Sequence, residues 1–227
     1  MGFEMLKAFF QLLCVALPWP IRRRLLNSVL GFSIDPDARV GLSVILADEL
    51  VMAPKASIGH FNYVGSLDRL QLGGDALIGN FNWITGISSR SNSRYYRRKP
   101  NRRSELIMGE SSSLIHRHYI DCTDRIEFGR FSVLAGVRSQ LVTHGVNPIS
   151  CRQSCSPIRI GAYTMIGTGV IILKGVQIPD FSVVMAGAVV SHVSAEQYSM
   201  FGGNPAVRIR EIPKTARIFA RTVREIL

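Results

Sequence analysis

Aliphatic residues recur at every sixth position of this chain. In the C-terminal half the series holds only isoleucine and valine, at Ile160, Ile166, Ile172, Ile178, Val184 and Val190. Upstream, the same spacing selects Ile34, Val40, Leu46, Met52, Ile58, Val64 and Leu70, and, after a phase shift of two residues, Leu72, Ile78 and Ile84. A helix repeats at about 3.6 residues and a strand at 2, so a period of six needs flat strands that turn a corner every six residues. It predicts an all-β parallel solenoid whose aliphatic side chains stack from coil to coil.

The residues around this series fit the corners of such a solenoid. Gly161 and Gly167 follow two of its members and are expected to supply the positive φ of a turn. Pro54 and Pro179 are also expected at corners, where a missing backbone donor costs little. A β-sandwich of short strands is the alternative, but its turns vary in spacing over roughly 8 to 12 residues, whereas the register here is constant within each block.

The period divides the chain into segments. The first solenoid block covers residues 34–86 and the second covers 126–212, and the period is lost between them, over 87–125. Within that insertion, Ser88–Arg103 contains arginine, lysine, tyrosine and serine but no acidic residue. We expect an exposed loop, which either lies on the binding face of the solenoid or is only a solvated excursion.

Both ends of the chain predict helices. Residues 1–33 include an apolar run from Ala8 to Ile21 followed by three arginines. The run is too short to span a bilayer and lacks a signal-peptide cleavage site, so we expect a helical segment that lies on a membrane surface or, alternatively, packs on the core. Residues 213–227 begin with proline and place apolar side chains on one face, which predicts a basic amphipathic helix.

Charge and cysteine content limit the partners. The 227 residues carry 27 Lys and Arg against 16 Asp and Glu, a formal net charge of +11, so an anionic partner such as nucleic acid, a membrane surface or a phosphorylated cofactor is expected. The four cysteines, Cys14, Cys122, Cys151 and Cys155, form no CxxC pair. Neither a disulfide framework nor a zinc ribbon is indicated, and a reducing, cytoplasmic compartment fits best.

The segment from Ile158 to Ile212, with its AGA and GGNPA sequences, resembles the C-terminal part of the hexapeptide-repeat acyltransferases. The arrangement of the whole chain resembles acetyltransferases encoded with bacterial exopolysaccharide or O-antigen synthesis. The resemblance implies a left-handed parallel β-helix, a homotrimer, and transfer of an acyl group from coenzyme A to a hydroxyl or amine. No metal is expected.

The resemblance also implies catalytic residues. Thr143 and His144 match the family's catalytic histidine motif, so His144 is expected to act as the general base that deprotonates a sugar hydroxyl in a direct transfer. Its orienting partner is left open among Asp121, Asp124 and Asn147. The backbone N–H of Thr168, after Gly167, matches the family's oxyanion donor.

Further positions match the family's donor site. Gly167, Thr168, Ala186 and Ser191 correspond to the groove that holds the pantetheine arm, and Arg208, Arg210 and Lys214 to the region that meets the 3′-phosphate. Val207 stands where relatives can have arginine. An ordinary solvated basic surface is the alternative for the three cations.

The acceptor site has weaker signals in the sequence. Asn80, Asn82 and Trp83 combine amides with an aromatic ring, as sugar sites do, and His118, Arg138 and Gln140 could reach the same pocket. Asparagines also form ladders between coils for purely structural reasons, and a tryptophan can belong to the core.

We therefore expect an O-acetyltransferase that uses acetyl-CoA to acetylate a sugar or lipid-linked glycan of a bacterial surface-polysaccharide precursor. It would be cytoplasmic and peripheral on the inner membrane. Three alternatives remain: a zinc enzyme like the carbonic anhydrases of this fold, using His116, His118 and His144, an inactive scaffold, and a nucleic-acid binder that uses Tyr95 and Tyr96 among the arginines. The basic loop resembles no recognition module, so we expect no nucleic acid.

Overall fold

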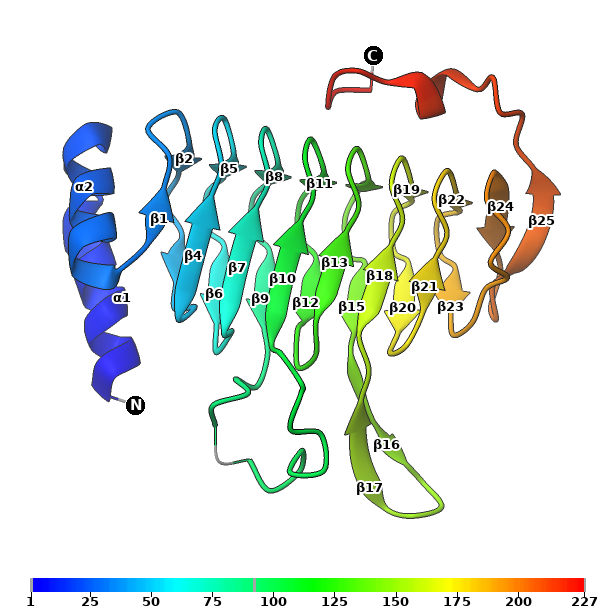
Figure 1. Cartoon of the computed structure of the whole chain (residues 1–227), viewed down its shortest axis with the longest axis horizontal. Helices are drawn as coiled ribbons and strands as arrows, with labels where there is room; N and C mark the ends of the chain where they lie inside the picture. The colour runs from blue at the N-terminus through cyan, green and yellow to red at the C-terminus, as the bar shows by residue number, and fades with distance from the viewer. Residues whose placement is uncertain (1, 92, 227) are drawn as a thin grey trace.

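The solenoid that the period predicts is present. In the computed structural model, which describes residues 2–91 and 93–226, each coil contributes one strand to each of three sheets, and the coils stack along the long axis of the molecule (Figure 1). Pairs between successive coils are parallel. The fold is a left-handed parallel β-helix, as expected.

The strands are short and regular. The first sheet contains β1 (Ser33–Ile34), β4 (Glu49–Met52), β7 (Arg69–Leu72), β10 (Glu105–Met108), β13 (Ile126–Phe128), β18 (Ile158–Ile160) and β21 (Gln177–Ile178). The second contains β2 (Arg39–Val40), β5 (Ser57–Ile58), β8 (Leu77–Ile78), β11 (Ser113–Leu114), β14 (Val133–Leu134), β19 (Met165–Ile166), β22 (Val183–Val184), β24 (Ser199–Gly202) and the antiparallel β25 (Val207–Glu211). The third contains β3 (Val44–Ile45), β6 (Tyr63–Gly65), β9 (Trp83–Thr85), β12 (Tyr119–Asp121), β15 (Gln140–Val142), β20 (Ile171–Leu173) and β23 (Val189–Val190).

The sixth-position series forms the core, except that Ile45 rather than Leu46 stacks on Val64 of the next coil. All of its members are buried, as are the C-terminal positions two residues earlier, Ile158, Thr164, Val170, Val176, Ser182 and Ala188. Each fully buried aliphatic side chain contributes about 1.5–3 kcal/mol. The phase shift between Leu70 and Leu72 also has a physical cause: Ile34 pairs with Met52, whereas Met52 pairs with Leu72, two residues further on. Relative to the coil before it, the longer coil takes one extra residue between β5 and β6 and one between β6 and β7, since Val40 pairs with Ile58, Ile45 with Val64 and Met52 with Leu72.

The glycines of the series have a different role from the one expected. Gly161 and Gly167 do not have positive φ; the left-handed residues are Tyr163 and Gly169, two positions later. A Cβ on Gly161 would lie 2.4 Å from the backbone nitrogen of Asp180 on the next coil. Close approach of two backbones, rather than turn geometry, therefore requires glycine there.

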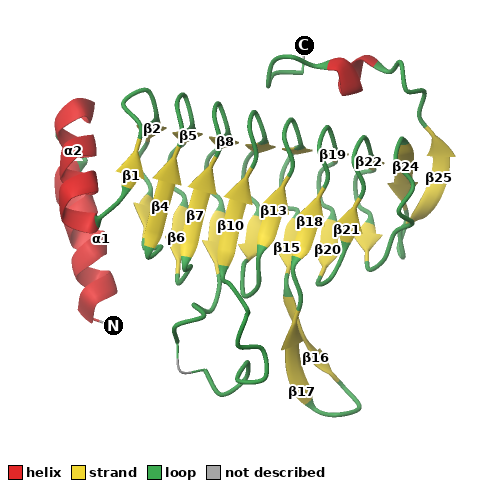
Figure 2. Ribbon diagram, in the orientation of Figure 1, coloured by secondary structure: helices red, strands yellow, loops and turns green. Residues whose placement is uncertain are grey.

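The N-terminal segment forms two helices that cover the first coil (Figure 2). These are α1 (Gly2–Cys14) and α2 (Trp19–Leu30), and α2 has proline in its first turn and ends at Gly31 with φ 70°. Arg22 donates to the carbonyls of Val40 and Gly41, and Arg23 donates to that of Ile34. Two of the three arginines therefore cap the open end of the solenoid. Neither helix among the described residues has the length and apolar character that a membrane span requires.

The predicted C-terminal helix is wrong. Among the described residues of 213–226 only Arg217–Ala220 is helical, and it is a short 3-10 turn, η1. The segment instead runs back along the coils (Figure 1), where Phe219 packs edge-on against Phe181 and Tyr198 and Arg224 pairs with Asp75 at 3.1 Å. Anchoring to coils this far apart requires an extended path, which an α-helix would shorten.

The insertion is also shorter than expected. The solenoid resumes at β10, so the strands β10, β11 and β12 lie within the residues 87–125 that were assigned to the loop. The period is in fact visible there, at Met108, Leu114 and Ile120. A second excursion, absent from the sequence expectations, is the hairpin of β16 (His144–Asn147) and β17 (Arg152–Cys155). Loop and hairpin leave the same edge of the solenoid (Figure 1).

Candidate active site

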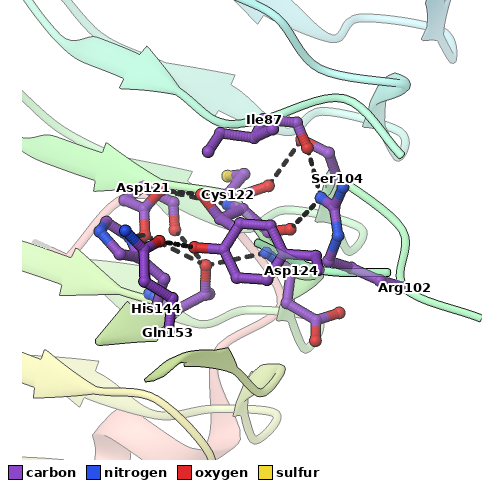
Figure 3. Close-up of polar contacts among 11 residues, drawn as sticks. Ile87, Arg102, Ser104, Asp121, Cys122, Asp124, His144 and Gln153 are labelled. Atoms are coloured by element: carbon purple, nitrogen blue, oxygen red, sulfur yellow. Dashed lines mark hydrogen bonds and ion pairs between the residues drawn. The ribbon is translucent and has the colours of Figure 1, made fainter. Parts of the chain in front are cut away.

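His144 is the first residue of the hairpin and is separated from strand β15 of the third sheet by Thr143. In the neighbouring coil, Asp121 ends β12 and pairs in register with Val142. The imidazole Nδ1 lies 2.6 Å from the Asp121 Oδ2 (Figure 3). Parallel stacking of two coils therefore joins a carboxylate and a histidine that are 23 positions apart in the sequence. Of the three partners left open, the structure selects Asp121.

The Asp121 carboxylate is held rigidly. Its side chain is 4% exposed, and it accepts hydrogen bonds from the backbone and hydroxyl of Thr123 and from the backbone N–H of Thr143. With Nδ1 facing a carboxylate, a neutral imidazole carries its proton on Nδ1 and presents a lone pair on Nε2. The His144 side chain is 40% exposed, and among the described residues no partner binds Nε2. The ring can therefore accept a proton from outside.

Thr168 lies at a different corner, before β20. Its hydroxyl is bonded to the carbonyl and N–H of Val137 at 2.8 and 3.0 Å, and no acceptor for its own backbone N–H is found within residues 2–91 and 93–226. Because Val142 pairs with Leu173, Thr168 and His144 occupy opposite edges of the third sheet. At ~3.3 Å per strand residue these edges are on the order of 10 Å apart, so one chain does not bring the two groups together.

The residues assigned to the donor groove divide between the two edges. Gly167 lies against Ala186 of the next coil, since a Cβ on Gly167 would be 2.7 Å from the Ala186 nitrogen. Thr168 accepts from the N–H of Gly187 at 2.9 Å. Ala186 and Ser191 are both exposed, but Ser191 follows β23 and lies on the His144 edge.

The three cations expected near the 3′-phosphate lie at the C-terminal end of the solenoid. Arg208 pairs with Glu196 at 2.8 Å and with the Ser199 hydroxyl at 2.9 Å. The Lys214 ammonium lies 5.4 Å from the centre of the Tyr198 ring. Arg210 is exposed on β25 and has no side-chain partner among the described residues. Arg210 is therefore the most available of the three for an anion.

The asparagines expected to bind the acceptor belong to a ladder between coils. Asn82 is 2% exposed, and its amide donates to Asn62 and Ile115 and accepts from the N–H of His118. Asn80 accepts from the N–H of His60 at 2.7 Å. Their amide groups are hydrogen-bonded between coils, as in the alternative in which the asparagines form a purely structural ladder.

Trp83, His118 and Arg138 also lie apart from His144. Trp83 is 53% exposed, but it packs against Tyr63 and lines an apolar cavity of about 470 Å³ beneath α1. His118 is 2% exposed and its Nδ1 accepts from the Ser139 N–H; burial, with a smaller contribution from His116, lowers its pKa to about 4. Arg138 is exposed at the corner opposite the hairpin.

The three histidines of the zinc alternative are used separately. His116 accepts from Asn80, His118 accepts from Ser139, and His144 faces Asp121. Within the described part of the chain, no three His, Cys, Asp or Glu side chains gather as a metal site would require. Among the described residues, the three imidazoles therefore do not form one zinc site.

The structure adds Arg102 and Gln153, which the sequence analysis did not select, and it gives a different role to Tyr96, which was considered there only for nucleic acid. Tyr96, from the basic loop, is buried and donates to the Gln153 side chain of the hairpin at 2.9 Å. Arg102 is buried with its guanidinium carbon 5.0 Å from the centroid of the Tyr96 ring, and it donates to the carbonyls of Ile87, Ser88 and Thr123. Figure 3 shows Arg102 beside Ile87. Burial raises the pKa of Tyr96 to about 12, so the phenol stays neutral. The signal in the sequence that could have indicated this anchoring was the pair of tyrosines, Tyr95 and Tyr96, within the arginine-rich loop.

No protein-family model matches the chain, and no curated protein matches it. Among solved structures, the polysialic-acid-specific acetyltransferase NeuO is similar over 79% of this chain and 80% of that chain, with a TM-score of 0.51 and 16% identity. The chain shares the fold of this acetyltransferase. The resemblance to hexapeptide-repeat acetyltransferases is thus confirmed at the level of the fold.

Two other solved structures are similar with lower scores. The polysialic acid O-acetyltransferase OatWY covers 79% of this chain and 84% of its own, at 16% identity and a TM-score of 0.46. A hexapeptide-repeat acetyltransferase from Vibrio cholerae O1 biovar eltor, complexed with acetyl coenzyme A, covers 93% of this chain and 88% of its own, at 15% identity and a TM-score of 0.47.

Proposed function

We propose that this protein is an acetyl-CoA-dependent O-acetyltransferase that acetylates a sugar hydroxyl of a bacterial surface-polysaccharide precursor. The observation that carries the proposal is the pair of His144 and Asp121, in which a buried carboxylate orients an imidazole whose Nε2 has no partner among the described residues. This pair lies on a fold shared with an acetyltransferase whose acceptor, by its name, is a polysaccharide.

The chemistry needs one base and one oxyanion donor. The His144 Nε2 takes the proton of the acceptor hydroxyl as that oxygen attacks the thioester carbonyl, and Asp121 stabilises the imidazolium that forms. The Thr168 N–H donates to the oxyanion of the tetrahedral intermediate. Collapse breaks the C–S bond, the imidazolium returns its proton to the coenzyme A thiolate, and the sugar leaves as the acetyl ester. No covalent enzyme intermediate forms.

This mechanism requires more than one copy of the chain. The base and the oxyanion donor occupy opposite edges of the third sheet, so a second copy has to place its Thr168 edge against the His144 edge of the first. A closed ring of three copies meets this condition with one repeated interface. Light scattering of the purified protein is expected to give the mass of a trimer, and a monomer that is active would exclude a shared site.

The donor would lie in the groove between two such copies. Gly167, Thr168, Ala186 and Ser191 offer backbone groups for the pantetheine arm, and Arg210, with Arg208 and Lys214, offers positive charge for the 3′-phosphate. Arg210 is the strongest of these three because neither a carboxylate nor a ring occupies its side chain among the described residues.

We also propose that the enzyme works at the cytoplasmic face of the inner membrane. The helix α1 supports this because its polarity is inverted: Gln11 and Lys7 are buried, and Gln11 bonds both backbone groups of Ile45. The outward face carries Met5, Leu6, Phe9, Leu12 and Leu13, which are 60–66% exposed. An apolar helix face of this kind can enter the headgroup boundary of a membrane.

Point variants test membrane contact better than truncation, because deleting α2 would remove the arginine caps of the first coil. Leu6→Ser, Phe9→Ser and Leu13→Ser together are expected to release the protein from anionic vesicles in a sedimentation assay. A triple variant that still sediments like the wild type would contradict the membrane proposal.

The deciding experiment for the acetyltransferase is the melting temperature of the whole protein with acetyl-CoA. A ligand at 100 times its dissociation constant stabilises the folded state by about 2.7 kcal/mol, so a clear upward shift is expected. Desulfo-coenzyme A, which keeps the nucleotide and the pantetheine arm but lacks the acetyl thioester, serves as the control for binding without the acetyl group. Folded protein that shows no shift with either compound would overturn the proposed donor.

A further inference from the structure

The basic loop and the hairpin enclose a groove that the proposed reaction does not use. Its volume is about 760 Å³, within the range of small-molecule sites. One wall comes from the loop, with Arg94, Tyr95, Arg97, Arg98 and Lys99, and the other from the hairpin, with Val146 and Arg152 among its residues. The loop and the hairpin are far apart in the sequence, so this groove exists only in the folded chain.

The positive charge of the groove is not neutralised. No carboxylate of the described residues forms an ion pair with Arg94, Arg97, Arg98 or Arg152, although other arginines, such as Arg90 and Arg125, do have acidic partners. The four side chains are exposed. Like charges gathered in this way repel one another, and an anion relieves that repulsion. Guanidinium groups also match carboxylate and phosphate oxygens in geometry.

The groove is fixed next to the proposed base. Tyr96 anchors the loop to Gln153, and Lys99 donates to the carbonyl of Cys155, the residue paired with His144 in the hairpin. Below them, the buried Arg102 ties the loop to the coil that carries Asp121 through the Thr123 carbonyl. A ligand seated in the groove would therefore extend toward His144.

We propose that this positively charged groove binds the acceptor through negative charge on the acceptor, so that the substrate is an anionic sugar. The inference rests on the proposed acetyltransferase function. The shared chemistry is a carboxylate or phosphate oxygen, supplied either by a uronic or other acidic residue of the glycan or by a diphosphate that links the sugar to its carrier. A nucleic acid fits less well: Tyr96 is buried and hydrogen-bonded, which leaves Tyr95 as the exposed ring of this pair for base stacking.

The test compares four probes on the full-length protein at low ionic strength: oligoglucuronate, UDP-N-acetylglucosamine, neutral dextran and single-stranded DNA. The variant is Arg97→Gln, Arg98→Gln and Arg152→Gln together. A matched control removes the same charge from exposed arginines elsewhere, with Arg24→Gln, Arg130→Gln and Arg217→Gln. The groove variant is expected to weaken binding of an acidic sugar about tenfold or more, with the control near wild type and the wild-type affinity falling as salt screens the charges.

The two anionic sugars separate the sources. A loss confined to oligoglucuronate assigns the charge to the glycan, and a loss confined to UDP-N-acetylglucosamine assigns it to the diphosphate. Equal binding by wild type and groove variant, or dextran bound as tightly as the acidic sugars, would overturn the proposal. So would tighter binding of DNA than of both sugars, which would assign the groove to nucleic acid.

Acetyl-CoA distinguishes a failure of the groove from a failure of the enzyme. Its thermal shift is expected to be the same in the groove variant and the wild type, and loss of the shift in the variant would place the donor phosphates in the groove and overturn the proposal. A wild type that binds acidic sugars but shows no acetyl-CoA shift would overturn the acetyltransferase and retain an anion-binding groove. A wild type that shows the acetyl-CoA shift but does not bind acidic sugars would overturn the proposed groove and leave the acetyltransferase proposal in place.

Discussion

Two histidines of this chain lie on adjacent coils and do opposite things. His118 is inside the ladder of polar side chains at one corner, where its Nδ1 accepts from Ser139 and burial lowers its pKa to about 4. His144 leaves the solenoid at another corner, where its Nδ1 faces the Asp121 carboxylate and its ring is 40% exposed. The comparison shows that a histidine within the coils has its ring buried in the polar ladder, whereas one at the point where the chain leaves the coils keeps an exposed ring nitrogen with no partner among the described residues.

The largest expected effect separates these two positions by activity. His144→Ala removes the proposed base and is expected to lower acetyl transfer by about 10²–10⁴-fold, measured as coenzyme A thiol released in the presence of acceptor. The acetyl-CoA thermal shift should be kept, because the donor does not need the imidazole to bind. Near wild-type turnover in the variant would show that His144 is not the base and that another group takes the proton.

The second expectation concerns stability at His118. Its folded pKa of about 4 lies below the ordinary 6.5, so the unfolded chain binds a proton more readily than the folded one as the pH falls. Stability is therefore complete above about pH 6.5 and falls by about 3 kcal/mol toward pH 4. His118→Asn keeps an acceptor for Ser139, as Asn82 does one coil earlier, and should remove this part of the slope in urea unfolding at pH 7, 5.5 and 4. The matched control is the exposed His192→Asn, and equal flattening in both variants would rule out the assignment to His118.

The third expectation tests what makes His144 different. Asp121→Asn keeps the shape of the partner but removes the charge that orients and stabilises the imidazolium, so a loss of about 10- to 100-fold in turnover is expected, with a changed pH profile and an intact acetyl-CoA shift. Asp124→Asn is the control, because that neighbouring carboxylate accepts from the Arg125 N–H and not from the histidine. Equal losses in the two variants would show that the carboxylates act through folding.

The smallest effect concerns a buried carboxylate without a histidine. Asp68 accepts from Ser88, Ser89 and Ser104 at the root of the basic loop. Burial alone would raise its pKa, but these hydrogen bonds outweigh burial and lower it. Its stabilising effect is present above the unfolded pKa of about 4 and is lost as the pH falls through the folded value. Asp68→Asn should cost about 1–3 kcal/mol at pH 7 and less at pH 3.5, measured by denaturant unfolding, while a constant difference would exclude the carboxylate charge as the cause.

The fold was open to prediction because its signal is repeated in every coil. The sixth-position aliphatics are buried as expected, and the same spacing continues at Met108, Leu114 and Ile120, where the insertion was drawn too long. The prediction of a C-terminal helix was wrong because it rested on a local signal alone. The apolar spacing is present, but Phe219 and Arg224 contact separate partners on distant coils. The spacing of residues within one segment does not predict its contacts with coils that are distant in the sequence.

The site was predictable only in part. The motif around His144 could be found in the sequence, whereas Asp121 was one of three equal partners until the pairing of β12 with β15 placed its carboxylate 2.6 Å from the ring. Asn80 and Asn82 are residues of the type found in sugar sites, but their side-chain amides form hydrogen bonds between neighbouring coils. Tyr96 and Arg102 had no periodic signal, because a loop is anchored by individual contacts.

By itself, the sequence determined the solenoid and its interior and pointed to the histidine that is proposed as the base, since each follows from a repeat or a short motif that is local in the chain. Only the tertiary structure decided which carboxylate lies against that histidine, which polar residues are hydrogen-bonded within the solenoid, and that a basic loop and a hairpin enclose one groove. The physical reason is that hydrogen bonds and charge act through space over a few ångströms, and stacking of the coils determines which side chains come within that range.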